Sequence, residues 1–167
     1  MRISVWNAAA PAALLVISAV YAPALAGPLH DAAKSGDTAQ VERLVAAGAA
    51  LDERDAGYRT ALHWAADTGH REVVDLLAAK GANVDEGDVT GFTPLHLAVI
   101  GKHEDIVRLL IARGAAVNTV ETEGESPLDA ATRFGLAGII EMLKGAGARC
   151  GESDVYSRQC KEAETRN

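Results

Sequence analysis

The sequence predicts an all-α fold, a solenoid of four stacked helix-turn-helix repeats with projecting loops. The first observation is a short motif centred on leucine that recurs with a period of 33 residues, at Leu29, Leu62, Leu95 and Leu128. The second is a stretch after each motif in which apolar residues are spaced one, three and four apart, as on one face of a helix. A fixed period of this length is typical of one supersecondary unit stacked on copies of itself.

Each repeat is expected to contain two helices joined by a polar corner. The first helices are predicted over residues 30–35, 62–68, 95–101 and 128–134. The second helices carry the apolar residues of 41–45, 73–77, 106–110 and 139–143, and a glycine suited to a left-handed helix end follows each of them. Thr60, Thr93 and Ser126 stand where the next helix needs an N-cap.

The repeats are assigned to residues 28–54, 55–87, 88–120 and 121–148. The stretch Gly91–Ala98, followed by Ile106–Leu110 and Gly114–Asn118, resembles the ankyrin repeat, and Thr60–Ala66 resembles it equally well. The resemblance covers about residues 28–148 and implies paired antiparallel helices, loops projecting at roughly right angles, and protein binding through the concave side. The end repeats depart from the pattern as terminal caps do: the fourth has Asp129 where the others have histidine.

A bacterial signal peptide is predicted over residues 1–26. Arg2 precedes an uncharged apolar run, and small residues lie at Ala24 and Ala26, before the expected cut. The alternative is an uncleaved membrane anchor, although the apolar run is shorter than the roughly 20 residues of a spanning helix. Cleavage would leave a repeat domain over residues 27–148 and a tail over 149–167, in the periplasm or secreted from the cell, with no membrane attachment and as a monomer.

The chain is acidic, with a formal net charge of −7 at pH 7. This balance argues against nucleic acid or an anionic membrane surface as the partner, because both require basic patches. Acidic residues gather between the repeats, and Asp52, Asp55, Asp85 and Asp88 follow the repeat pattern, so they are interpreted as structural. The surplus acids are Glu53, Glu86, Glu123 and Glu125, which either attract a partner with a basic surface or serve solubility.

Both cysteines, Cys150 and Cys160, lie in the tail. In an exported chain they are expected to form a disulfide that holds the tail as a cap, the alternative being two free thiols in a disordered tail. A metal site is not expected there, because two ligands are too few.

The histidines fall in two rows, His30, His63 and His96 in one, and His70 and His103 in the other. Equivalent positions in adjacent repeats are separated by roughly 8–10 Å, too far for shared metal coordination, so we expect these side chains to tie loops to helices. No catalytic motif is found, and neither an enzyme activity nor a cofactor is predicted.

The resemblance places partner contacts on the loop tips and the inner helix face. Trp64, Phe92, Ile100 and Phe134 are predicted to form an apolar strip flanked by acidic residues, as in interface hot spots, although Trp64 could instead pack between repeats. The full predicted set is Arg59, Trp64, Asp67, Val89, Thr90, Phe92, Ile100, Glu123, Glu125, Arg133 and Phe134. The predicted function is non-enzymatic protein binding. The alternatives are a periplasmic immunity or inhibitor protein against a toxin or enzyme, and an accessory protein for a periplasmic oxidative-stress enzyme.

Overall fold

The computed structural model describes residues 22–153 and 155–165. Over these residues the chain is helical and contains no β-strand, which confirms the predicted all-α class. The helices are α1 (Ala22–Ser35), α2 (Thr38–Ala46), α3 (Ala61–Thr68), α4 (Arg71–Ala79), α5 (Pro94–Ile100), α6 (Glu104–Ala112), α7 (Pro127–Arg133), α8 (Ala137–Gly145) and α9 (Ser157–Glu164).

Most of the predicted signal peptide, residues 1–21, lies outside the described residues. The first helix was expected to begin at residue 30, but α1 begins at Ala22. Alanine and leucine, which favour helix, are frequent in the preceding segment and extend it toward the N-terminus. In the described part of the chain, no helix combines the length and the apolar character needed to cross a bilayer.

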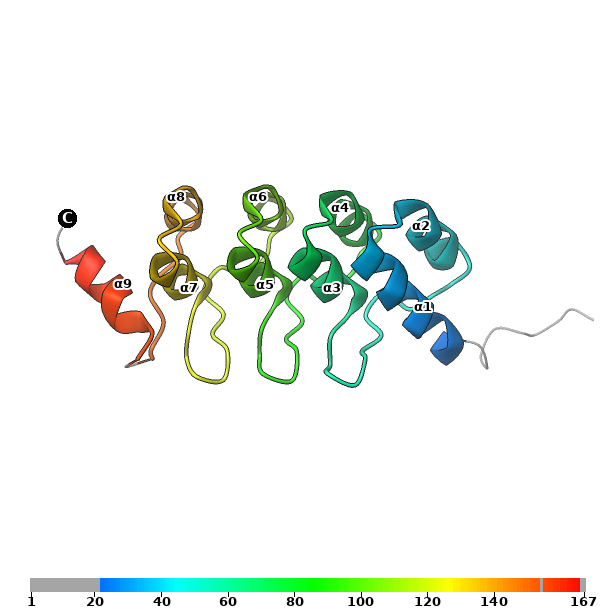
Figure 1. The fold of residues 1–167 in the computed structure, drawn as a ribbon, viewed down its shortest axis with the longest axis horizontal. Helices are drawn as coiled ribbons and strands as arrows, with labels where there is room; N and C mark the ends of the chain where they lie inside the picture. The colour runs from blue at the N-terminus through cyan, green and yellow to red at the C-terminus, as the bar shows by residue number, and fades with distance from the viewer. Residues whose placement is uncertain (1–21, 154, 166–167) are drawn as a thin grey trace, which may run out of the picture.

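The helices form two rows (Figure 1). The helices α1, α3, α5 and α7 lie side by side in the inner row and α9 continues it, while α2, α4, α6 and α8 form the outer row. Loops project from the inner row, away from the outer one, before α3, α5 and α7. The leucines of the recurring motif lie between the rows and are no more than 1% exposed, at Leu29, Leu62, Leu95 and Leu128. Burial of each contributes roughly 2 kcal/mol to folding.

The inner helices α3, α5 and α7 each begin with a buried polar pair. The backbone N–H and the hydroxyl of Thr60 both donate to Nδ1 of His63, at 3.1 and 2.9 Å. Because Nδ1 accepts, the proton of the imidazole sits on Nε2, which donates to the carbonyl of Phe92 in the next loop at 3.1 Å. Thr93 and His96 repeat the pair at the start of α5. The predicted loop-to-helix tie is confirmed for His63.

The second histidine row joins neighbouring repeats. His103 lies at the start of α6, and its Nε2 bonds to the carbonyl of Asp67 at the end of α3, at 3.1 Å. Gly69 leaves room for this ring, since a Cβ there would lie 2.6 Å from it. His70 and Gly36 make the same arrangement one repeat earlier.

The tail closes the solenoid. Its helix α9, which was not among the predicted helices, packs on α7. Asp129 stands where the preceding repeats have histidine, and its Oδ2 accepts the N–H of Gly151 at 2.7 Å. His63 faces a backbone carbonyl of the next loop, whereas Asp129 faces a backbone N–H. The side chain at residue 129 must therefore accept a hydrogen bond, as a carboxylate does. Cys150 and Cys160 are joined as a disulfide with their Cα atoms 5.8 Å apart, which ties α9 to the chain that follows α8.

We predict that Gly69→Ala destabilises the protein more than Gly135→Ala does. Both glycines have a positive φ, of 83° and 67°, so alanine costs each about 1 kcal/mol. Only at Gly69 must the new methyl group also displace a histidine ring, which adds about 1–2 kcal/mol through the lost bond of His103. Urea unfolding of the two variants measures the difference, and equal losses of stability would contradict the role given to His103.

Burial lowers the pKa of His96 to about 4, and the neighbouring carbonyl of Glu125 only partly opposes this. Because the pKa is near 6.5 in the unfolded chain, the unfolded state binds more protons between these values. Stability from neutral His96 is therefore complete above about pH 6.5 and is lost as the pH falls toward 4, by about 3 kcal/mol in total.

We predict that the unfolding free energy of His96→Gln changes less steeply between pH 4 and pH 7 than that of the unsubstituted protein. Denaturant titrations at several pH values measure both slopes. Since acidic groups contribute alike to both proteins, identical slopes would show that His96 is not the buried group that titrates.

Candidate functional site

Each projecting loop contains a carboxylate that accepts backbone N–H groups of the same loop. Oδ1 of Asp88 accepts the backbone N–H groups of Thr90 and Phe92 at 2.9 and 3.1 Å. Asp55 holds Gly57 and Arg59 in the same way, and Glu121 holds Glu123 and Glu125, all at 2.8–2.9 Å. Burial opposes the charge of Asp88, but hydrogen bonds from Thr90, Phe92 and Arg59 outweigh it and hold the pKa of that carboxyl below its usual value.

The loops also bind one another. The N–H of Val89 donates to the carbonyl of Gly57 at 3.1 Å, and the N–H of Thr122 donates to that of Thr90 at 2.9 Å. A second series of hydrogen bonds links successive repeats: the N–H of Asn83 donates to Asp52, and the N–H of Ala116 donates to Asp85. The structural role predicted for the acids at 52, 55, 85 and 88 is confirmed, and the loop backbone forms a continuous, internally bonded platform.

One cluster of charged and aromatic side chains lies where α3 meets its loop. Arg59 pairs with Asp67 and Asp88, at 3.2 and 3.3 Å. Its guanidinium carbon lies 5.1 Å from the ring centroid of Trp64, and Nζ of Lys34 lies 4.5 Å from it. The indole N–H donates to Asp55 at 2.9 Å. Trp64 reaches the first repeat through Lys34, so it contributes to packing between repeats, and it also stays partly exposed.

A second cluster lies in the fourth repeat. Arg133 forms a two-pronged ion pair with Glu125, at 2.8 and 3.0 Å. Its guanidinium carbon lies 4.4 Å from the ring centroid of Phe134 and 5.4 Å from that of Tyr156. Glu125 is only 4% exposed, so its carboxylate positions Arg133 and offers little surface to a partner. Phe134, in contrast, is 39% exposed.

The third repeat places apolar groups between the two clusters. Phe92 is half-buried and meets the ring of His96 edge-on, with centroids 5.7 Å apart. Ile100 is half-buried at the end of α5, and Val89 at the loop tip is 66% exposed.

A pocket of about 250 Å³ opens between the second and third projecting loops, those before α5 and α7. It brings together five of the predicted residues, Thr90, Phe92, Glu123, Glu125 and Arg133. Arg59, Trp64 and Asp67 meet in the first cluster instead, and Phe134 joins the second through Arg133. We call the surface formed by both clusters, Phe92, Ile100, Val89 and this pocket the inner surface.

Sequence reasoning missed three residues of the inner surface. Tyr156 lines the pocket from the tail, and its hydrogen bond to the Glu123 carboxylate, with the charge of that group, raises the pKa of Tyr156. No repeat register applies to the tail, so no signal pointed to it. Lys34 could have been found, because it is one period before Asp67 and two before Ile100. Lys102, whose Nζ lies 5.9 Å from the Phe134 ring centroid, precedes the second helix at a corner position.

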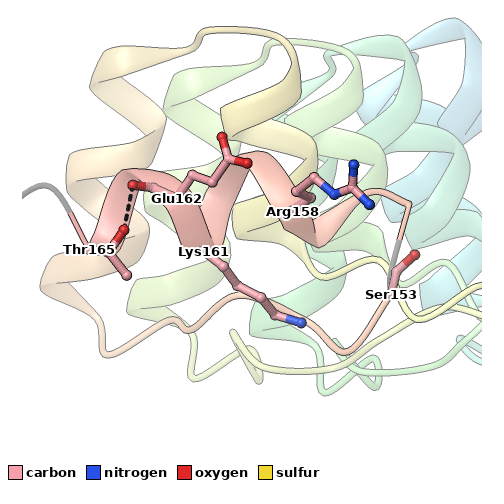
Figure 2. A pocket seen from close by; sticks show the side chains of 5 residues that line it. All are labelled: Ser153, Arg158, Lys161, Glu162 and Thr165. Carbon is pink, nitrogen blue, oxygen red and sulfur yellow. Dashed lines mark hydrogen bonds between the residues drawn. The ribbon is translucent and has the colours of Figure 1, made fainter.

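A larger pocket, of about 500 Å³, lies at the C-terminal end of the solenoid and not on the inner surface (Figure 2). It is lined by Ser153, Arg158, Lys161, Glu162 and Thr165. In Figure 2, Lys161 and Arg158 extend toward the side of Ser153, whereas Glu162 points away from Lys161. The hydroxyl of Thr165 donates to the carbonyl of Glu162, at 3.0 Å. Arg158, Lys161 and Glu162 come from α9, and Ser153 comes from the chain before it; this lining includes no nucleophile paired with a base.

Residues 29–121 and 88–154 match a family model described as ankyrin repeats, in three copies. No curated protein matches the chain.

Proposed function

Because the chain belongs to the ankyrin-repeat family, whose members are protein-interaction modules, we propose that it is an exported, non-enzymatic module that binds a protein partner through its inner surface. This surface corresponds to the concave side of the solenoid, formed by the inner helices and the projecting loops. The proposal includes action as a monomer, in the periplasm or outside the cell.

The observation that carries the proposal is the pair of arginine–aromatic clusters on either side of Phe92. Arginine and large aromatic residues are the types that dominate binding energy at protein interfaces. Arg59 and Arg133 are each held by carboxylates and by an aromatic ring before any partner arrives. Side chains that are already ordered lose less conformational entropy on binding, so more of the contact energy remains as affinity.

The loop tips supply the rim of the proposed interface. Val89 and Thr90 are exposed at the tip of the second loop, and Glu123 is exposed on the third. Glu86 pairs with Arg54, and Glu125 pairs with Arg133, so two of the four surplus acids are partly neutralised. The attraction to a basic partner therefore rests on the net negative charge of the chain and on Glu53 and Glu123, and we expect it to act mainly on the rate of association.

Export is proposed from the leader pattern together with the disulfide. Disulfides persist in oxidising compartments and are rare in the cytosol of ordinary bacteria. Cleavage after Ala26 would fall inside α1 and leave Pro28 near the new N-terminus, where proline is tolerated in the first turn of a helix. Mass determination of the protein recovered from the periplasm would give the cleavage position directly.

We predict that Phe134→Ala and Arg133→Ala each weaken binding of the partner by about tenfold or more, because both remove an ordered interface anchor. The partner is obtained by affinity capture from periplasmic extract, and its Kd is then measured with purified protein. Arg108→Ala is the matched control, since this arginine is exposed on α6 of the outer row.

The folding of all three variants is checked by far-UV circular dichroism and melting temperature, which we expect to change little. Unchanged affinity in both inner-surface variants, or an equal loss in Arg108→Ala, would contradict the proposed surface. Raising the salt concentration separates the charge contribution: we expect slower association, while the effect of Phe134→Ala persists.

A further inference from the structure

Three side chains with metal-binding chemistry meet beneath the terminal helix. One ligand atom each from Asp129, Cys150 and Cys160 lies within 4.8 Å of the other two. They come from α7, from the chain after α8 and from α9. Asp129 is 0% exposed and Cys160 is 2% exposed, while Cys150 is half-buried. Only the two cysteines could be recognised as ligands from the sequence, and the fold adds the carboxylate of Asp129 as a third.

Asp129 carries an oxygen without a partner. Its Oδ2 accepts four hydrogen bonds, from the N–H and hydroxyl of Ser126, the N–H of Gly151 and the hydroxyl of Ser157, at 2.7–2.9 Å. Its Oδ1 is fully buried and has no hydrogen-bond partner among the described residues. A buried acceptor left unpaired costs about 1–3 kcal/mol. The hydrogen bonds thus fix the carboxylate in place through Oδ2 and leave Oδ1 without a partner, in a carboxyl group that lies beside the two sulfur atoms.

We propose that the C-terminal cap, once its disulfide is reduced, binds a thiophilic divalent cation such as Zn²⁺ through Asp129, Cys150 and Cys160. Thiolate and carboxylate are both ligands of zinc, and the softness of the two sulfur atoms favours Zn²⁺ over Mg²⁺ or Ca²⁺. Three protein ligands leave one tetrahedral position for water. Bonds of about 2.3 Å to sulfur and about 2.1 Å to oxygen place the ligand atoms of a loaded site roughly 3.5–3.8 Å apart. The two sulfur atoms, which are bonded to each other in the disulfide, therefore move apart after reduction to share the cation.

A dithiol can serve as the reductant of the disulfide between Cys150 and Cys160. The dithiol transfers two electrons and two protons to the disulfide, which gives the thiols of Cys150 and Cys160, and itself becomes a disulfide. The cation then displaces both thiol protons to solvent and binds two thiolates and the carboxylate, so the loaded site carries one net negative charge. Reoxidation of the sulfur atoms would release the cation, and the disulfide and the metal therefore exclude each other.

A route to the site is present. A pocket of about 340 Å³ opens beside Cys150 and is lined also by Ser126, Gly151 and Glu152. It gives access to Cys150, the least buried of the three side chains, so a cation would enter from this side. The same cap is then closed in two ways, by the disulfide under oxidising conditions and by the metal when thiols are reduced.

The test uses the untagged full chain, reduced with a dithiol that is then removed under anaerobic conditions, and titrated with Co²⁺ as a spectroscopic substitute for Zn²⁺. We expect a thiolate-to-cobalt charge-transfer band in the near ultraviolet that saturates at one equivalent and disappears when Zn²⁺ is added. The oxidised chain should give no band. Cys160→Ser should abolish the band, and Asp129→Asn should weaken cobalt binding at least tenfold, whereas Glu141→Gln, at an exposed acid of α8, should bind as the unsubstituted chain does.

Because Asp129→Asn also alters hydrogen bonds of the cap, a second measurement uses the unsubstituted protein alone. Zn²⁺ should slow the reaction of the reduced cysteines with an aromatic disulfide reagent at least tenfold. Absence of the charge-transfer band in the reduced chain, saturation at half an equivalent, which indicates metal shared between two chains, or no protection of the thiols by Zn²⁺ would each overturn the proposal.

Discussion

Asp88 accepts two backbone N–H groups of its own loop, and the other projecting loops depend on Asp55 and Glu121 in the same way. A loop of this length without a strand ladder would otherwise leave its amides to solvent and sample many conformations. With the carboxylate in place, the loop has one shape. Phe92 and its counterparts one period away, Arg59 and Glu125, then project at a fixed angle toward the inner helices. The acids that look like a charged surface in the sequence therefore support the shape of the inner surface.

The stacking of repeats depends on a second set of buried polar contacts. A solenoid has contacts only between neighbours, so each interface must specify its own register. His63 does this by donating to the Phe92 carbonyl of the next loop, and His103 by bonding back to Asp67 of the preceding repeat. The last repeat has no repeat after it, and there Asp129 accepts the N–H of Gly151. One change of side chain thus converts a stacking contact into the contact that seats the cap.

Much of the fold could be predicted because a period of 33 residues fixes every element at once: the leucines, the helix starts at Thr60 and Thr93, and the glycine helix ends. The tail could not, since α9 has no repeat to align with and its polar sequence shows its role only once it packs on α7. At the candidate site, Arg59 and Arg133 could be predicted from the sequence as surface contacts, but the side chains that pair with them could not. The repeat register gives the position of a residue along the solenoid, whereas pairing depends on how far each side chain reaches, as for Glu125, which lies buried beneath Arg133.

The central claim is that the loop carboxylates, and not the loop tips themselves, hold the inner surface in place. Native-state hydrogen exchange of Asp88→Ala tests it most directly. The account predicts that the amides of Thr90 and Phe92 lose at least tenfold protection, while those of Gly57 and Arg59, held by Asp55, keep theirs. Unchanged protection at Thr90 and Phe92, or an equal loss in both loops, would contradict it.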